Sequence, residues 1–404
     1  MSNRTSGRRG RSAINRGVLR VLVLGHTAEL GGAELALERL CEEIRRSRSD
    51  VDVRVLLLDD GPLVERLEQV GVPVQVLAAP RGVVSASRKS LGAERVLRLA
   101  FGLVATEFRL WGVMQRFRPD VVHTNSLKAH LLGTIPAVAA RRVVVWYAHD
   151  RIAEDYMPRR AVRIVRAVGR LPRAVIANSR ATAATLGRRA TVAYPGLRAA
   201  QTIPPECPVP ARAEGPVVGI VGRISETKGQ LEFVRAAERI VASRPEVRFR
   251  VVGGTAFGTE AYQEAVVAES RRLGLEDRFE WVGSVPDTRA ELDAMSVCVH
   301  ASPVPEPFGQ VVAEALARGV PVVATDAGGV PEILRGSVGA AGTLVPPGDV
   351  EAMAEAVLDV LDDLSEVLRR ADEARAEVVA RFGIDTTASV VTEVWRAAVT
   401  SQDR

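Results

Sequence analysis

The chain has 404 residues, with 25% charged and 47% hydrophobic residues as in an ordinary globular protein, and this length predicts two or three domains with cores of their own. The net charge of +5 suggests two candidate partners, nucleic acid and an anionic membrane surface. Aromatic residues are only 4% of the chain and no nucleic-acid-recognition motif occurs, so a basic nucleic-acid-binding protein is a remote alternative and no nucleic acid is expected.

Cysteine usage and the N-terminus indicate the compartment. Cys41, Cys207 and Cys298 lie far apart without CxxC spacing, which favours a reducing cytoplasm and argues against a disulfide framework or a zinc site. No run of about 18 apolar residues occurs, so no transmembrane helix is expected. Residues 1–17 carry five arginines and no apolar core, which indicates a disordered basic tail rather than a signal peptide. The wealth of Ala, Val and Arg suggests a GC-rich bacterial genome.

The first strand and the turn after it form the first candidate site. Residues 19–24 predict a buried strand, and Gly31-Gly32-Ala33-Glu34 then opens a helix that reaches about Arg46. An α/β sheet offers its ligand crevice at such a turn, and the two glycines let the backbone approach a ligand closely. A tight turn that only packs the helix onto the sheet is the alternative. The turn is not a GxGxxG, so a dinucleotide site is unsupported.

Strands and helices then alternate, which predicts a parallel sheet with right-handed crossovers. Polar residues follow three of the strands, namely His123 to Lys128, His149 with Asp150, and Asn178 with Ser179. Polar groups at the carboxyl ends of parallel strands line the crevice, and Ser179 is also expected to cap the next helix. Further strands are predicted at 51–58, 74–77, 121–124, 143–146 and 174–177.

Two segments, 88–118 and 158–173, interleave basic and apolar residues. Basic amphipathic helices of this kind can lie on anionic lipid. Solvated helices that pack on the sheet have the same pattern, and we favour that interpretation.

The second half begins after a Pro-rich linker at 196–215. Residues 217–221 predict a new strand, and the turn Gly222 to Gly229 after it carries Arg223 and Lys228. An Arg and a Lys on one strand-to-helix turn can both reach a diphosphate. Two surface cations without a ligand are the alternative.

The stretch from Ser302 to Glu332 carries the most specific pattern. It predicts an extended Pro-rich loop, a helix at 309–318, a strand at 320–324 and a Gly-rich turn. Glu306 precedes the helix and Glu314 lies inside it, with seven residues between them. A helix start favours an anionic ligand, and carboxylates suit neighbouring sugar hydroxyls, so the pair fits a nucleotide sugar. A solvated acidic pair at a helix N-terminus is the alternative.

This stretch closely resembles the retaining glycosyltransferases of family 4, which have the GT-B fold, and the resemblance extends from about residue 19 to residue 399. The consensus residues supplied here are Glu306, Phe308, Gly309, Glu314, Ala315, Ala317, Gly319, Pro321, Val322, Ala324, Gly328, Gly329 and Glu332. The resemblance implies an α/β fold of two Rossmann-like domains whose parallel sheets face a central cleft. It places an acceptor domain at 18–195, a nucleotide-sugar-binding domain at 216–384, and a last helix at 385–400 that packs back onto the first domain.

The same resemblance implies roles for individual residues. Arg223, Lys228 and the backbone N–H groups near Phe308, Gly309 and Gln310 would meet the leaving diphosphate, while Glu314 would hold the ribose and Glu306 the transferred sugar. The other donor-side residues that it implies are Gly31, Gly32, Gly253 and Val285, with His149 on the transferred sugar and His123 with the 125–128 turn on the acceptor side. The catalytic set is therefore Glu306, His149, Arg223 and Lys228.

The expected reaction transfers a hexose from a UDP- or GDP-sugar to an acceptor with retention of configuration. The leaving phosphate would take the acceptor's proton, so no general base is assigned. No tightly bound cofactor and no metal are expected, and Asp50-Val51-Asp52, which spells a metal-binding DxD, is dismissed because it lies at the wrong end of its strand.

The acceptor is a lipid-linked sugar, a polysaccharide or a small molecule, in the synthesis of cell-envelope polysaccharide, glycolipid or secondary-metabolite glycosides. The expected location is the cytoplasm, with peripheral contact to the inner face of an anionic plasma membrane if the acceptor is lipid-bound. A GT-B nucleotide-sugar epimerase or a phosphorylase-like enzyme is the alternative.

Overall fold

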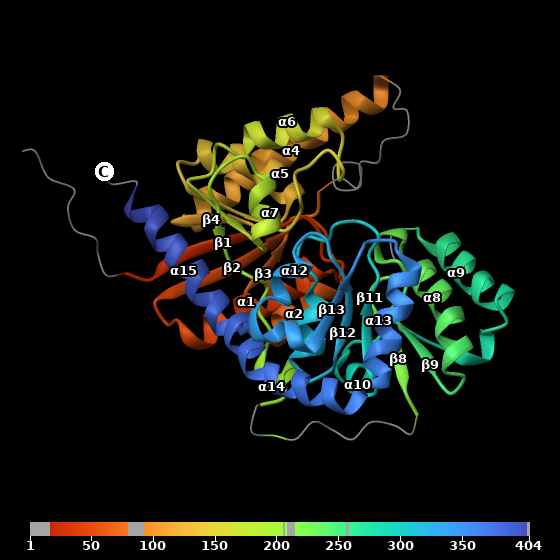
Figure 1. Ribbon diagram of the computed structural model, residues 1–404. Helices are drawn as coiled ribbons and strands as arrows, with labels where there is room; N and C mark the ends of the chain where they lie inside the picture. The colour runs from red at the N-terminus through yellow and green to blue at the C-terminus, as the bar shows by residue number, and fades with distance from the viewer. Residues whose placement is uncertain (1–16, 80–92, 205–206, 208–214, 256–257, 402–404) are drawn as a thin grey trace, which may run out of the picture.

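The computed structural model describes residues 17–401 except 80–92, 205–206, 208–214 and 256–257. Residues 1–16 of the expected basic tail at 1–17, the first residues of the basic segment 88–118, and nine of the twenty residues of the linker 196–215 lie outside the described residues. The described chain forms two parallel sheets flanked by helices, one in each half (Figure 1). The predicted fold class, two Rossmann-like domains, is therefore confirmed.

The N-terminal sheet has seven strands in the order β3-β2-β1-β4-β5-β6-β7, and every neighbouring pair runs parallel. The strand β1 lies inside the sheet because both of its faces are apolar. Val21 and Val23 pack into one buried layer, and Leu22 and Leu24 pack into the other. The strands are β1 (Leu19–Gly25), β2 (Val51–Leu57), β3 (Val74–Val76), β4 (Val121–Thr124), β5 (Val143–Ala148), β6 (Ala174–Ala177) and β7 (Thr191–Val192).

The C-terminal sheet has six parallel strands in the order β10-β9-β8-β11-β12-β13. In both sheets the order reverses beside the first strand, β1 or β8, and ligands of such folds bind at the carboxyl ends of the strands at this reversal. The strands are β8 (Val217–Val221), β9 (Arg248–Val252), β10 (Phe279–Gly283), β11 (Val297–His300), β12 (Val322–Thr325) and β13 (Gly342–Val345).

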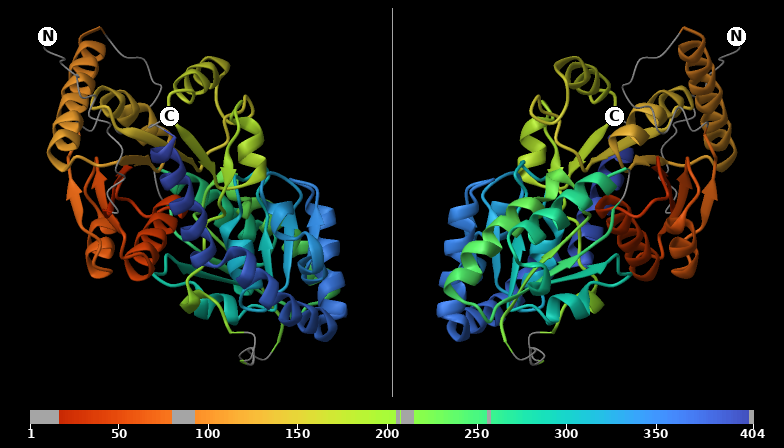
Figure 2. Two further views of the ribbon diagram at one scale, coloured as in Figure 1. Left: turned by 90° about the vertical axis from the view of Figure 1, so that its left-hand side faces the viewer. Right: turned by 90° about the vertical axis from the view of Figure 1, so that its right-hand side faces the viewer.

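Helices connect the strands and cover the sheets (Figure 2). Among the described residues, no helix is both long enough and apolar enough to span a bilayer. In the first half they are α1 (Gly32–Ser47), α2 (Pro62–Gln69), α4 (Ala93–Phe117), α5 (Leu127–Ala139), α6 (Arg159–Val168) and α7 (Arg180–Thr185). In the second half they are α8 (Gln230–Ser243), α9 (Glu260–Arg272), α10 (Arg289–Asp293), α11 (Gln310–Leu316), α12 (Val330–Ile333), α13 (Val350–Asp362), α14 (Leu364–Phe382) and α15 (Ile384–Thr400).

The chain passes between the two halves twice, and the two passages lie side by side. The N–H of Leu197 donates to the carbonyl oxygen of Phe382 at 2.7 Å, and the N–H of Ile384 donates to the carbonyl oxygen of Leu197 at 3.0 Å. After this crossing, α15 packs on α1 and on the strands of the N-terminal sheet, where Trp395 is fully buried. The C-terminal helix is thus part of the N-terminal core.

A carboxylate from the second half also closes a helix of the first half. Glu332 accepts hydrogen bonds from the backbone N–H groups of Arg180 and Ala181, at 2.9 and 2.7 Å, and from the hydroxyl of Tyr194 at 3.0 Å. These N–H groups belong to the first turn of α7, where the hydroxyl of Ser179 accepts from the N–H of Thr182 as the predicted cap. The start of α7 is therefore stabilised from both domains.

Candidate active site

A carboxylate, a cation and an imidazole meet at the carboxyl ends of the C-terminal sheet. Glu306 lies between β11 and α11, and its Oε1 forms an ion pair with Nζ of Lys228, which follows β8. Its Oε2 is hydrogen-bonded to Nε2 of His300, whose Nδ1 lies 3.2 Å from the hydroxyl of Thr325. Burial opposes ionisation of Glu306, but the charges and hydrogen bonds of Lys228 and His300 hold its pKa far below the ordinary value. The carboxylate is therefore negative at neutral pH and fixed from two sides.

The loop that carries Glu306 is held by backbone contacts. Gly328, with φ of 66°, lies so close that a Cβ there would collide with the Glu306 carbonyl, to which the N–H of Gly329 donates at 2.8 Å. The hydroxyl of Ser302 lies 2.6 Å from the carbonyl oxygen of Thr227, beside Lys228. These contacts set the position of the carboxylate relative to the cation.

The turn after β8 carries Arg223, whose side chain is exposed. Burial raises the pKa of Glu34 and of Tyr156, two groups of the N-terminal domain, and the positive charge of Arg223 counteracts both shifts. Gly253, at the end of β9, has φ of 143° and approaches this turn so closely that a Cβ would collide with the carbonyl oxygen of Gly222. Its own N–H donates to the sheet, to the carbonyl oxygen of Gly283 at 2.8 Å. Gly253 thus supports the turn of Arg223 through its backbone.

The first turn of α11 presents backbone rather than side chains. Gly309 is its N-cap residue, and no side chain caps the helix. The ring of Phe308 is buried, with centroids 5.5 Å from Tyr194 and 5.7 Å from Phe382. Val285, which follows β10, is half-buried against the same apolar cluster as Phe308. A ligand at this turn would therefore meet the backbone of the predicted residues.

Gln310 joins α11 to α1 of the opposite domain. With its amide oriented for complementary contacts, the nitrogen donates to the carbonyl oxygen of Gly32 at 3.1 Å and the oxygen accepts from Arg39. Arg39 is 4% exposed, and burial lowers its pKa while the charge of Glu314 raises it. Glu314 accepts from the side chain of Gln201 at 3.2 Å, and burial raises its pKa against the effect of Arg39. Three predicted residues, Gly32, Gln310 and Glu314, are thus brought together.

The N-terminal domain contributes a neutral imidazole. His149 lies at the end of β5, with its Nε2 3.2 Å from Oδ1 of Asn125 and its ring 4.2 Å from that of Tyr147. Burial, with a smaller contribution from His123, lowers the pKa of His149 to about 3. At neutral pH this ring is uncharged and can exchange hydrogen bonds with a hydroxyl group.

Two carboxyl groups of the same domain lie nearby. The carboxyl group of Glu34 folds over Gly31, so that a Cβ on this glycine would lie 2.6 Å from it. Burial raises the pKa of Glu34 to about 7, and the neighbouring Asp150 adds to the shift. Burial also raises the pKa of Asp150, against a hydrogen bond of 3.3 Å from the hydroxyl of Tyr156. The charge of Glu306 acts on Tyr156, so the two domains face each other here.

His123, which was expected on the acceptor side, lies in the interior of the N-terminal domain beneath α15. Its side chain is fully buried, and its Nδ1 accepts a hydrogen bond of 3.0 Å from the indole of Trp395. Its ring also meets those of Tyr147 and Trp395 edge to face. Because α15 covers this end of β4, His123 anchors the C-terminal helix.

Three residues of the site were missed from the sequence. His300 ends the apolar strand β11, Arg39 lies in an amphipathic helix, and Gln201 lies in the linker, so each has an ordinary local pattern. The signal that was available for His300 is its position directly after a buried strand, as for His149. Arg39 and Gln201 gain their place only from contacts between the domains.

Metal-binding groups are few in this region. Within the described ranges, no three His, Cys, Asp or Glu side chains lie close enough to hold a metal ion. Asp50 forms a 2.7 Å ion pair with Arg396, and Asp52 lies 3.4 Å from Arg54. The DxD triplet is thus engaged at the start of β2.

Comparison with known proteins gives matches in both halves of the chain. Residues 30–197 match the family described as Glycosyltransferase Family 4, and residues 215–363 match the one described as Glycosyl transferases group 1. A D-inositol 3-phosphate glycosyltransferase of Streptomyces scabiei is 31% identical over 86% of this chain and 78% of its own length. A 2-deoxystreptamine N-acetyl-D-glucosaminyltransferase of Streptomyces fradiae is 30% identical over 92% of this chain and 91% of its own length.

Solved structures share the whole arrangement. Anabaena HepE in complex with UDP-glucose matches with a TM-score of 0.78 and 27% identity, over 94% of this chain and all of that one. Sucrose-phosphate synthase from Thermosynechococcus elongatus matches with a TM-score of 0.76 at 19% identity, which is a likeness of fold alone.

Proposed function

Because the chain belongs to the glycosyltransferases of the GT-B fold, we propose that it transfers a hexose from a UDP- or GDP-sugar to an acceptor hydroxyl with retention of anomeric configuration. The bond between the anomeric carbon and the β-phosphate oxygen breaks, and a bond to the acceptor oxygen forms on the same face of the sugar. The acceptor's proton passes to the leaving phosphate, and the nucleoside diphosphate is released. No general base is then required.

The observation that carries this proposal is that Lys228 and Arg223 lie on one turn, and that the charge of Arg223 reaches Glu34, close behind Gly31 and Gly32 in the other domain. Negative charge grows on the β-phosphate as the bond breaks, and fixed cations that meet it lower the barrier. Lys228 is fixed by its ion pair with Glu306. The charge of Arg223 acts on the pKa of Glu34 and of Tyr156 in the facing domain. These two cations supply the positive charge that a metal supplies elsewhere, so we expect transfer to persist in the presence of a chelator.

The carboxylates divide between the two halves of the donor. Glu314 accepts hydrogen bonds from the ribose hydroxyls, with Arg39 and Gln201 holding its position. Glu306 accepts from hydroxyls of the transferred sugar and stabilises positive charge at its ring. His149, uncharged at neutral pH, contacts the same sugar from the N-terminal domain.

The choice of donor is supported by the relatives. HepE was solved with UDP-glucose, and the Streptomyces fradiae relative is an N-acetyl-D-glucosaminyltransferase, so a UDP-hexose is the first donor to test. The names of these relatives give D-inositol 3-phosphate and 2-deoxystreptamine as acceptors, so a small cyclitol is the first acceptor to test. A lipid-linked sugar and a polysaccharide are the other candidates. We place the enzyme in the cytoplasm, where nucleotide sugars are made.

The test is a thermal-shift panel of nucleotide sugars, followed by assay of nucleoside diphosphate release with and without acceptor. A bound donor raises the melting temperature by mass action. We expect a shift with a UDP- or GDP-sugar and release that depends on the acceptor. Release that is equal without acceptor, or conversion of the donor to its epimer, would support the alternative enzymes and contradict transfer.

A further inference from the structure

The helix α4 exposes an apolar stripe. Val104, Phe108 and Trp111 recur at helical spacing and are 49%, 70% and 42% exposed, whereas Leu110 and Met114 on the inner face are fully buried. Long apolar side chains on both faces of a surface helix are unusual, because the outer face of such a helix is ordinarily polar. The outer stripe is thus available for a partner.

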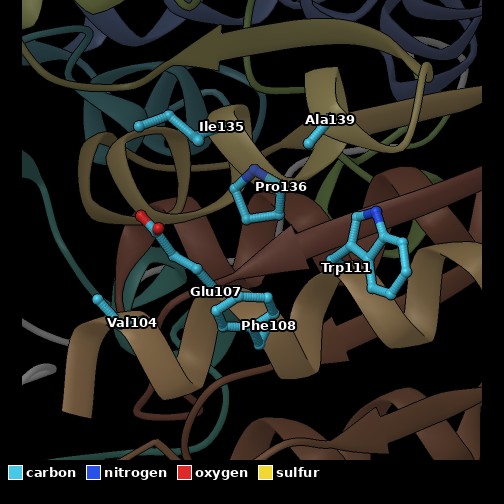
Figure 3. Close-up of a pocket in the computed structure, with 7 residues that line it drawn as sticks. All are labelled: Val104, Glu107, Phe108, Trp111, Ile135, Pro136 and Ala139. Carbon is cyan, nitrogen blue, oxygen red and sulfur yellow. The ribbon is translucent and has the colours of Figure 1, made fainter. Parts of the chain in front are cut away.

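A groove continues this stripe onto α5. It has a volume of about 230 Å³ and lies between the two helices, as Figure 3 shows. Ile135 is 53% exposed at its edge, and Val138 on the same helix is 48% exposed. The groove is lined by Val104, Glu107, Phe108, Trp111, Ile135, Pro136 and Ala139.

The helix α6, which packs on α5, also exposes an apolar side chain. Val162 and Val165 pack inward, while Ile164 is 59% exposed on the outside. Leu171, three residues after the end of α6, is 53% exposed. Figure 1 shows α4, α5 and α6 on the part of the N-terminal domain that points away from the C-terminal domain, and α5 lies between α4 and α6 and contacts both. We call this layer of three helices the α4–α6 face.

The segment that carries these apolar residues also has an excess of positive charge. Residues 102–173 contain thirteen basic and five acidic side chains, an excess of eight that exceeds the net charge of the whole chain, +5. The exposed arginines of this segment are Arg109, Arg116, Arg118, Arg141, Arg159, Arg160, Arg163, Arg166, Arg170 and Arg173. Such an excess is unfavourable by self-repulsion unless an anionic partner compensates it.

The five carboxyl groups of this segment are largely engaged elsewhere. Asp150 lies at the active site, Asp120 accepts from the backbone of Arg20, and Glu154 and Asp155 form ion pairs with Arg159 and Arg151. Glu107 lines the groove, where burial raises its pKa. The α4–α6 face therefore opposes little negative charge to an anionic surface.

We propose that the α4–α6 face docks the enzyme on a bilayer that contains anionic lipids. Phe108 and Trp111 enter the interfacial region, where aromatic rings are favoured, with Ile135 and Ile164 beside them, while the arginines meet lipid phosphates. An anionic bilayer matches both the apolar side chains and the positive charge of the face, since its hydrocarbon core lies beneath a continuous layer of negatively charged headgroups. A protein partner would need an apolar patch within a wide acidic rim.

This docking is independent of the proposed reaction. The α4–α6 face contains none of the residues assigned to the donor, so its substitution leaves donor binding unchanged. An enzyme held in this way acts at the membrane surface, and a lipid-linked acceptor would then be reached in two dimensions rather than three.

The test is co-sedimentation of the full-length protein with vesicles of phosphatidylcholine alone or with 30 mol% phosphatidylglycerol, a composition of about one anionic lipid in three. We expect binding to the anionic vesicles to exceed binding to the neutral ones by at least about 10-fold. The double variant Phe108→Ser with Trp111→Ser should weaken it at least about 10-fold through lost apolar burial. The pair Arg160→Glu with Arg163→Glu should weaken it at least about 30-fold.

Matched controls separate a defined face from general basicity. Arg271→Glu with Arg272→Glu reverses two exposed cations on α9 of the other domain, and Val18→Ser removes an exposed apolar residue elsewhere. Both should bind vesicles like the unchanged protein, and every variant should stay folded and keep its donor-induced thermal shift. Equal loss in the α9 variant, no preference for anionic vesicles, or a dimer that dissociates on Phe108→Ser with Trp111→Ser would overturn the proposal.

Discussion

Lys228 and Glu306 form an ion pair although 78 residues separate them in the sequence. Each follows a different strand of the C-terminal sheet, and β11, which leads to Glu306, is the direct neighbour of β8, which leads to Lys228. Their side chains are 25% and 16% exposed, so the pair is partly shielded from water and stronger than an ordinary surface pair. Loss of either partner leaves a charge without compensation.

We therefore expect Lys228→Met to lower kcat/KM by at least about 100-fold, because a fixed cation at the leaving diphosphate is lost. Glu306→Gln should lower kcat by a similar factor while the protein stays folded. Steady-state kinetics with circular dichroism would measure both effects. Arg235→Met, which breaks an exposed ion pair with Glu269 on the same domain, is the matched control and should remain active. Full activity in the Lys228 variant would contradict its assignment.

Glu314→Gln should weaken binding of the nucleoside diphosphate by about 10- to 100-fold, since a charge-assisted hydrogen bond contributes about 1.5–3 kcal/mol. Isothermal titration with the nucleoside diphosphate and with pyrophosphate would measure this. Pyrophosphate lacks a ribose, so its affinity should be unchanged. Equal loss for both ligands would mean that Glu314 only shapes the site.

Gly253→Ala should weaken donor binding although no side chain of the donor site is altered. A Cβ would collide with the carbonyl oxygen of Gly222 and displace the turn of Arg223. Gly274→Ala is the matched control, because this glycine also has a positive φ, of 70°, but no atom lies within 4 Å of its Cβ position. Both variants pay about 1–3 kcal/mol of backbone strain, but only Gly253→Ala should lose the thermal shift with donor. Equal shifts in the two would show that the turn of Arg223 tolerates displacement.

The carboxyl group of Glu34 should make stability depend on pH. Burial raises its pKa from 4.5 in the unfolded chain to about 7 in the fold. Its protonated form is therefore favoured in the fold, and the resulting stability is complete below pH 4.5 and lost as the pH rises through 7. At pH 8, Glu34→Gln should raise the free energy of unfolding by up to about 3 kcal/mol, and with it the melting temperature. At pH 4 the substitution should change the melting temperature little. An equal difference at both pH values would contradict the raised pKa.

Strand ends were the most productive signal in the sequence. Buried runs followed by polar residues predicted the sheets, the position of His149 and the turn with Arg223, because the carboxyl ends of parallel strands share one edge. The Glu306 loop could be predicted too, since its Pro residues restrict the backbone and its Gly residues allow the positive φ of the turns. These features depend on local chain geometry, which the order of residues determines directly.

Contacts between distant segments could not be predicted in this way. The sequence places His123 and His149 both near the carboxyl end of a buried strand, yet His123 lies inside β4 and contacts Trp395, whereas His149 follows β5 and lies near the site. The difference arises because α15, 272 residues later, covers the end of β4. Arg39 is similar, since its burial depends on α11 of the other domain.

The side-by-side crossing at Leu197 and Gly383 determines how this chain can be recombined with others. Exchange of the donor-binding half would have to cut at both passages, because α15 carries Trp395 into the core of the acceptor half. A hybrid that replaces residues 198–383 and retains α15 keeps both cores intact. A hybrid joined at a single point would bring in a foreign last helix, with no matching partner for the imidazole of His123.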